Sequence, residues 1–185
     1  IASVDYEDMV HVVDSENVTV GERTLVEYAI RLKDAGADID TIVDTLNAEK
    51  KNIRVVGLLD TLEYLKKGGR ISKTAAIVGG MLSIKPVIAI ESGEVVMLGK
   101  ARGSKQGNNL LVQQIEKAGG VDFSKPYYLG YAGLDDTLLK KYIADSAHIW
   151  QEYADRLDIM SVGGAIGTHV GPGAIAVAFF DKNNG

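Results

Sequence analysis

The sequence predicts an α/β protein of two lobes, a short α/β lobe over residues 1–60 and an α+β lobe over residues 61–185. Up to residue 60 the hydrophobic pattern runs strand, helix, helix, strand, which is typical of a crossover between parallel strands. Beyond it, a hairpin pattern is followed by strands that alternate with helices, which indicates a mixed or antiparallel sheet. The 185 residues are 46% hydrophobic, enough for one good core or two small ones.

The expected first lobe begins with the apolar run VHVV at 10–13, read as a strand that ends at Asp14-Ser15. Apolar residues then recur at helical spacing from Gly21 to about Ala35, and again after Asp40, so two helices are expected. The run IRVVGLL at 53–59 predicts a buried strand.

The next helix is expected to begin at Asp60, where Glu63 completes a pattern like a capping box. Gly68 is the expected glycine just past its C-terminus, and Lys66 and Lys67 suit its last turn. Ordinary helix termination therefore explains Gly68.

Gly69 and Arg70 need another explanation. Ser72 is a good N-cap for a further helix over 73–82, so Arg70 would lie beside a helix N-terminus, which attracts anions. An apolar, glycine-rich stretch follows directly.

The remaining elements follow from local pattern. Two β-rich arms around Ser92-Gly93 predict a hairpin over 85–103. A helix over 104–118, a strand over 127–132 and a long helix over 135–157 come next, and strands over 158–162 and 174–180 close the chain.

The segment 159–180 runs 22 residues without a formal charge, long enough to cross a bilayer. Its five glycines and Pro172 oppose a helix. We therefore expect strand, loop and strand with His169 at the lobe interface, and no membrane span.

Charge is unevenly distributed. The net charge of −5 argues against general nucleic-acid binding. Residues 66–105, however, carry eight Lys/Arg against two acids, which indicates a local anionic ligand or partner unless the clustering is chance. The absence of cysteine fits a reducing cytosol and no signal peptide is recognised, so a cytoplasmic protein is expected.

His169 is the histidine to which we assign a site role, because the glycines of GTHVGPG bring the backbone close to it and Thr168 adds a hydroxyl. His11 and His148 are expected to be structural or solvated. No nucleophile–base motif, metal-ligand spacing or phosphate loop accompanies His169. The residues therefore favour binding over catalysis.

The stretches LEYLKKGGRISKTAAIVGGMLSIKP, KARGSKQ and GTHVGPGA resemble the DegV family of bacterial fatty-acid-binding proteins. The resemblance implies a DegV-like fold of two lobes with a long-chain fatty acid between them, here with a truncated first lobe that lacks its N-terminal part. It implies a lipid-binding subunit without a cofactor rather than an enzyme. That subunit presents the fatty-acid carboxylate to an ATP-dependent fatty acid kinase subunit, which forms an acyl phosphate for phospholipid synthesis.

The resemblance also assigns residues. The fatty-acid head would contact Arg70, Gly69, His169 and Thr168; the tunnel would be lined by Ile77, Met81, Leu82 and Ile84; and the kinase subunit would dock on Arg102, with Lys100 and Lys105 beside it. An arginine suits the head because a buried carboxylate needs a partner and the guanidinium offers a planar pair of donors.

Two other functions stay open at this point. His169 could act as the base of a hydrolase or acyltransferase, although no nucleophile is apparent. Alternatively, the chain could be an interaction module that docks an acidic protein through its basic 66–105 face.

Overall fold

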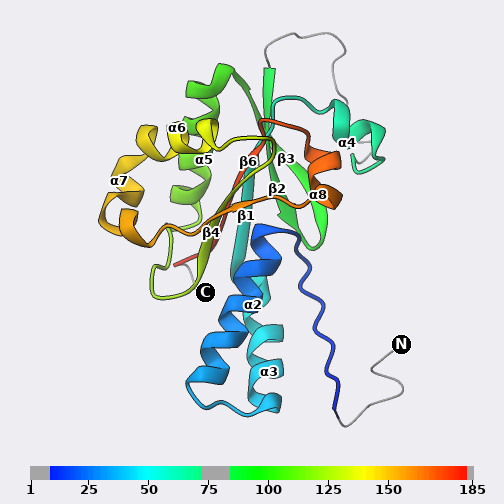
Figure 1. Cartoon of the computed structure of the whole chain (residues 1–185), viewed down its shortest axis with the longest axis vertical. Helices are drawn as coiled ribbons and strands as arrows, with labels where there is room; N and C mark the ends of the chain where they lie inside the picture. The colour runs from blue at the N-terminus through cyan, green and yellow to red at the C-terminus, as the bar shows by residue number, and fades with distance from the viewer. Residues whose placement is uncertain (1–8, 72–83, 183–185) are drawn as a thin grey trace.

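The computed structural model describes residues 9–71 and 84–182. A six-stranded sheet forms its centre (Figure 1). Helices α5, α6 and α7 cover one face of the sheet, whereas α2, α3 and α8 lie on the other. The predicted α/β class with a mixed sheet is confirmed.

The strand order of the sheet is β3-β2-β1-β6-β4-β5. In chain order the strands are β1 (Ile53–Leu58), β2 (Ile84–Glu91), β3 (Glu94–Arg102), β4 (Tyr127–Tyr131), β5 (Ile159–Ser161) and β6 (Ile175–Phe180). Only β4 and β5 pair in parallel; the other neighbours are antiparallel. Ser92 and Gly93 both have positive φ, as the expected two-residue hairpin turn requires.

The predicted parallel crossover in the first 60 residues is wrong. Residues 10–13 form no strand, and β1 pairs antiparallel with both β2 and β6. An apolar run becomes a strand only where another strand offers hydrogen bonds, and no strand within the described ranges lies beside 10–13. The lobe boundary at residue 60 stays a prediction, although β1 shares its sheet with strands that follow that residue.

One face of the sheet carries the larger core. Helix α5 (Gly103–Lys117) packs there with α6 (Thr137–Asp145) and α7 (Ala147–Trp150), and Trp150 is fully buried. The long helix predicted over 135–157 is instead broken into α6, α7 and the 3₁₀ segment η2 (Gln151–Arg156). Buried Ser146 lies at the break, and its hydroxyl donates to the Tyr142 carbonyl at 2.6 Å, a bond that bends helices.

The opposite face is covered by α2 (Val20–Asp34) and α3 (Ile39–Glu49), which match the two predicted helices. The Asp38 side chain caps α3 by accepting from Thr41 N–H at 2.8 Å. Lys125, in the loop before β4, ties α3 to the sheet because its Nζ bonds Glu49 at 2.6 Å and lies 4.9 Å from the Phe180 ring centre.

Two short helices complete the fold, α4 (Glu63–Lys67) and α8 (Gly164–Val170). The segment 159–180 was expected to be strand, loop and strand. Strands β5 and β6 are present, but α8 lies between them, so that expectation needs correction. Most of the glycine and proline penalty is avoided, because Gly163 and Gly171 flank α8 and Pro172 lies beyond its end, which leaves Gly164 at the first position and Gly167 inside the helix. No helix among the residues the structure describes combines the length and apolarity needed to span a bilayer.

Candidate functional site

The C-terminus of α4 shows why the sequence carries two adjacent glycines. Gly68 has ordinary right-handed backbone angles, whereas Gly69 has φ +67°. The N–H of Gly69 donates to the Lys66 carbonyl at 3.1 Å, and that of Arg70 to the Leu65 carbonyl at 3.0 Å. This is a Schellman motif, so Gly69 rather than Gly68 is the glycine that ends the helix, which corrects the prediction.

Gly68 serves a close approach between helices. A Cβ at Gly68 would overlap Nδ1 of His169, and a Cβ at Gly171 would overlap the ring of Tyr64. The absence of a side chain at Gly68 therefore makes room for the His169 ring of α8. In the same way, Gly171 makes room for the Tyr64 ring of α4. Segments that are far apart in the sequence meet here, and Figure 1 shows α4 and α8 side by side.

Arg70 and His169 both lie against Gly68. The Nη1 of Arg70 donates to the Gly68 carbonyl at 2.8 Å, while the rest of the side chain is exposed. A guanidinium has five N–H donors, so most of its donors remain for an anion. His169 is half-buried, and its Nδ1 is buried without a hydrogen-bond partner among the described residues. A buried polar atom of this kind normally acquires a partner.

The other predicted head-group residue, Thr168, is exposed and already engaged. Its hydroxyl donates to the Ala165 carbonyl at 2.9 Å within α8. Within the described part of the chain no hydroxyl or carboxylate hydrogen-bonds to His169. The arrangement that a histidine base and its nucleophile require is therefore not seen there.

Of the predicted tunnel residues, Ile84 is half-buried at the start of β2, where it pairs with Arg102 of β3. Ile77, Met81 and Leu82 lie outside the described residues, as does the helix predicted over 73–82.

An apolar cavity of about 50 Å³ lies between the sheet and α8, several times the volume that one water molecule needs. Ile166 and Val170 of α8 line it, together with residues of β1, β2 and β6. The helix α8, which carries His169, therefore also contributes to the cavity wall through Ile166 and Val170, whereas Gly68, Arg70 and His169 themselves do not line it. Thr19, just before α2, also lines the cavity, although no motif in the sequence marks it.

The predicted docking residues lie at the corner where β3 leads into α5. Lys100, Arg102 and Lys105 are all exposed, and none forms an ion pair with another described residue. The N-terminus of α5 adds the positive end of its dipole to the same place. The corner therefore attracts negative charge.

The electrostatics around α4 are otherwise simple. Lys67 bonds Glu63 at 2.6 Å, and this hydrogen bond lowers the pKa of the Glu63 carboxyl. The described residues contain no group of three or more His, Asp or Glu side chains that could hold a metal ion.

Comparison with known proteins identifies the family. A family model described as an uncharacterised protein of the DegV family matches residues 1–182. The chain belongs to the DegV family. The resemblance to the DegV family that the sequence motifs indicated is therefore confirmed, since the match covers nearly the whole sequence.

The DegV relatives include one DegV domain-containing protein of Caldanaerobacter subterraneus, which is 34% identical over 175 residues, 94% of this chain and 61% of the relative. The chain thus spans about three fifths of the length of that relative.

Two solved structures share the fold. One, from Thermus thermophilus, is described as showing fatty-acid binding of a DegV family protein. It has a TM-score of 0.82 and 25% identity, covering 97% of this chain and 64% of that one. The other, a fatty-acid-binding DegV family protein from Streptococcus agalactiae, has a TM-score of 0.78 and 27% identity, covering 98% of this chain and 63% of that one.

Proposed function

We propose that this chain binds a long-chain fatty acid, with the carboxylate beside Arg70 and His169 and the hydrocarbon tail along the apolar cavity. The observation that carries the proposal is that these two side chains meet at Gly68 and that α8, which carries His169, also lines that cavity. Two DegV structures of similar fold are described as fatty-acid binding, which supports the same ligand class.

The chemistry of the cluster suits a carboxylate. Arg70 supplies a permanent positive charge and unused donors, and a charge-assisted bond to a carboxylate is about twice as strong as a neutral one. His169 supplies a ring nitrogen that lacks a partner in the described part of the chain. The cavity contributes apolar surface, and each buried CH₂ of the tail stabilises the complex by about 0.8 kcal/mol.

We further propose that the chain acts as a carrier rather than an enzyme, and presents the carboxylate to an ATP-dependent kinase subunit for acyl-phosphate formation in phospholipid synthesis. The exposed cations Lys100, Arg102 and Lys105, placed at the positive end of α5, would bind an acidic surface of that subunit. Arg102 is also the register partner of Ile84, so the docking corner adjoins the start of β2, which directly follows the predicted tunnel stretch.

Residues 1–60 are proposed to be part of the first lobe. Val26 and Ile30 of α2 and Ile39 of α3 are 54%, 46% and 51% exposed, and all three line one surface hollow. An apolar helix face of this kind favours a further layer of structure over it.

The experiment is a fatty-acid binding measurement by isothermal titration with stearic acid. Arg70→Ala and His169→Ala should each weaken binding about tenfold or more, because a hydrogen bond to a charged group contributes about 1.5–3 kcal/mol. Lys66→Ala is the matched control, since Lys66 is an exposed cation on the same helix turn. Failure of the unmodified chain to bind, or equal binding by all four proteins, would refute the proposal.

A further inference from the structure

Thr19 places a hydroxyl group beside an apolar cavity. Thirteen of the fourteen described residues that line the cavity, Thr19 being the exception, carry aliphatic side chains or none. The Oγ1 atom of Thr19 is buried and has no hydrogen-bond partner among the described residues. A buried hydroxyl without a partner costs about 1–3 kcal/mol, so it normally indicates a missing binding partner.

The usual role of a threonine at this position does not account for the hydroxyl. Thr19 is the N-cap residue of α2, yet its side chain makes no capping hydrogen bond. Its backbone φ is +47°, a conformation that is unusual and strained for a β-branched residue. Thr19 therefore holds an unfavourable conformation without the benefit that a cap would provide.

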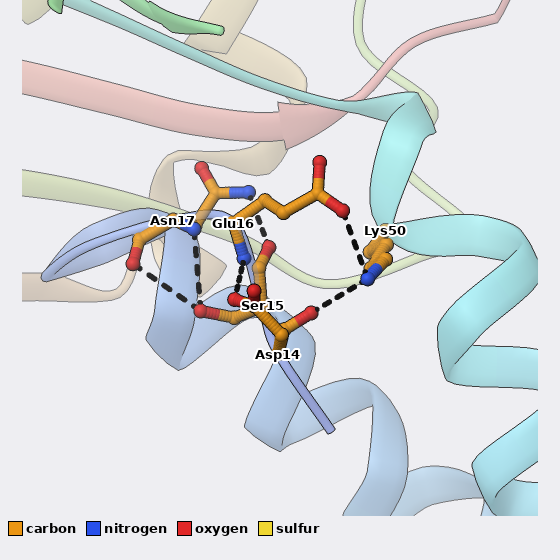
Figure 2. A network of polar contacts seen from close by, with 5 residues as sticks. All are labelled: Asp14, Ser15, Glu16, Asn17 and Lys50. Atoms are coloured by element: carbon orange, nitrogen blue, oxygen red, sulfur yellow. Dashed lines mark hydrogen bonds and ion pairs between the residues drawn. The ribbon is translucent and has the colours of Figure 1, made fainter. Parts of the chain in front are cut away.

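The preceding turn keeps Thr19 in place. The Lys50 ammonium bonds the Asp14 carbonyl at 2.8 Å and the Glu16 carboxylate at 2.9 Å (Figure 2), so Lys50, which directly follows α3, anchors this turn. Within the turn, the Asp14 carboxylate accepts from the Glu16 N–H at 2.9 Å, and Asn17 Nδ2 donates to the Ser15 carbonyl at 3.1 Å. The position of Thr19 is thus fixed by contacts that lie outside the cavity.

Thr19 lies away from the proposed head-group site. Next to Thr19, Val18 lines the cavity as well, and a Cβ at Gly21 would overlap Val55 of β1. Leu59 and Val170, which share a hydrophobic cluster with Leu65 of α4, line the cavity too. From Val55 to Leu59 an extended strand rises about 13 Å. A ligand whose carboxylate lies at Arg70 would therefore reach Thr19 with the interior of its chain.

We propose that Thr19 is a specificity residue that recognises a polar substituent, such as a hydroxyl group, on the acyl chain of the bound fatty acid. This proposal rests on the proposed fatty-acid binding and adds a preference among fatty acids. The hydroxyl and methyl groups of Thr19 leave the same carbon, so rotation between staggered χ1 positions exchanges them at the cavity wall. A hydroxylated chain then gains one hydrogen bond, and Thr19 Oγ1 acquires its partner.

The test compares stearic acid with 10-hydroxystearic and 12-hydroxystearic acid by isothermal titration of the full chain. The unmodified protein should bind one of the hydroxylated acids about 3- to 10-fold more tightly than stearic acid, the gain that one hydrogen bond gives. Thr19→Val, which keeps the shape and removes the hydroxyl, should abolish or reverse this preference. Thr19→Ser, which keeps the hydroxyl, should retain it.

Equal or weaker binding of both hydroxylated acids by the unmodified protein would overturn the proposal, and so would a preference that survives in Thr19→Val. A parallel loss of affinity for all three acids in Thr19→Val would overturn it too, because Thr19 would then act on the carboxylate or on cavity shape. If Thr19→Val does not fold, Thr19→Ala is measured in its place. Stearic acid binding itself tests the proposed function, so the two failures are distinguishable.

Discussion

Replacing Gly68 by alanine tests the contact that brings α4 and α8 together. The φ of Gly68 is −77°, which alanine adopts without strain, so the backbone does not oppose the change. The new methyl group would instead overlap the imidazole of His169. The His169 ring has to turn away, or α8 has to move.

The size of the effect follows from two opposing contributions. Forcing an extra methyl group into a packed contact costs about 1–3 kcal/mol. Replacing glycine by alanine at a compatible position stabilises the folded protein by about 0.4–1 kcal/mol, because alanine restricts the conformations of the unfolded chain. Gly68→Ala should therefore lower the free energy of unfolding by up to about 2.6 kcal/mol. Because His169 is displaced, fatty-acid affinity should fall as far as in His169→Ala.

Gly69→Ala is the matched control. A Cβ at Gly69 would meet no atom within 4 Å, but its φ of +67° costs a non-glycine residue about 1–2 kcal/mol. Both variants should thus lose similar stability in urea unfolding, while only Gly68→Ala should shift the His169 ring signals in an NMR spectrum. Unchanged His169 signals and unchanged stearic acid affinity in Gly68→Ala would refute the reasoning.

Two further predictions concern the docking corner and acid stability. Arg102→Glu should impair phosphorylation of the bound fatty acid by a kinase subunit and leave stearic acid affinity intact, with Lys51→Glu as the control; a loss of lipid affinity would place Arg102 in the pocket instead. The hydrogen bond from Lys125 lowers the pKa of the Glu49 carboxyl despite its partial burial. The stability that the Glu49–Lys125 pair gives the folded protein is therefore fully present above the unfolded Glu pKa of about 4.3. It is lost as pH falls through the lower folded-state pKa of Glu49. Glu49→Gln should lower unfolding stability at pH 7 by up to about 1 kcal/mol, a difference that should shrink at pH 3; a constant difference in urea titrations would contradict the assignment.

Local pattern in the sequence determined most elements of this protein. The helical spacing that predicts α2 and α3, the apolar run that predicts β1 and the Ser92-Gly93 turn between β2 and β3 all depend on residues close together in the chain. Such patterns arise because side chains repeat every 3.6 residues in a helix and every two in a strand, whatever lies elsewhere. Arg70 and His169 were likewise predicted as head-group residues from the short motifs around them, and this role stays a prediction.

Only the tertiary structure decided which distant segments meet. Residues 10–13 have the sequence pattern of a strand but do not form one, because a strand also needs a neighbouring strand to supply hydrogen bonds. Residues 68 and 69 are both glycine in the sequence, yet Gly69 ends α4 whereas Gly68 makes room for His169. That difference arises from the contact between α4 and α8, which local pattern does not encode. Thr19 was missed for the same reason, because its place in the cavity depends on β1, β6 and α8, which lie far from it along the chain.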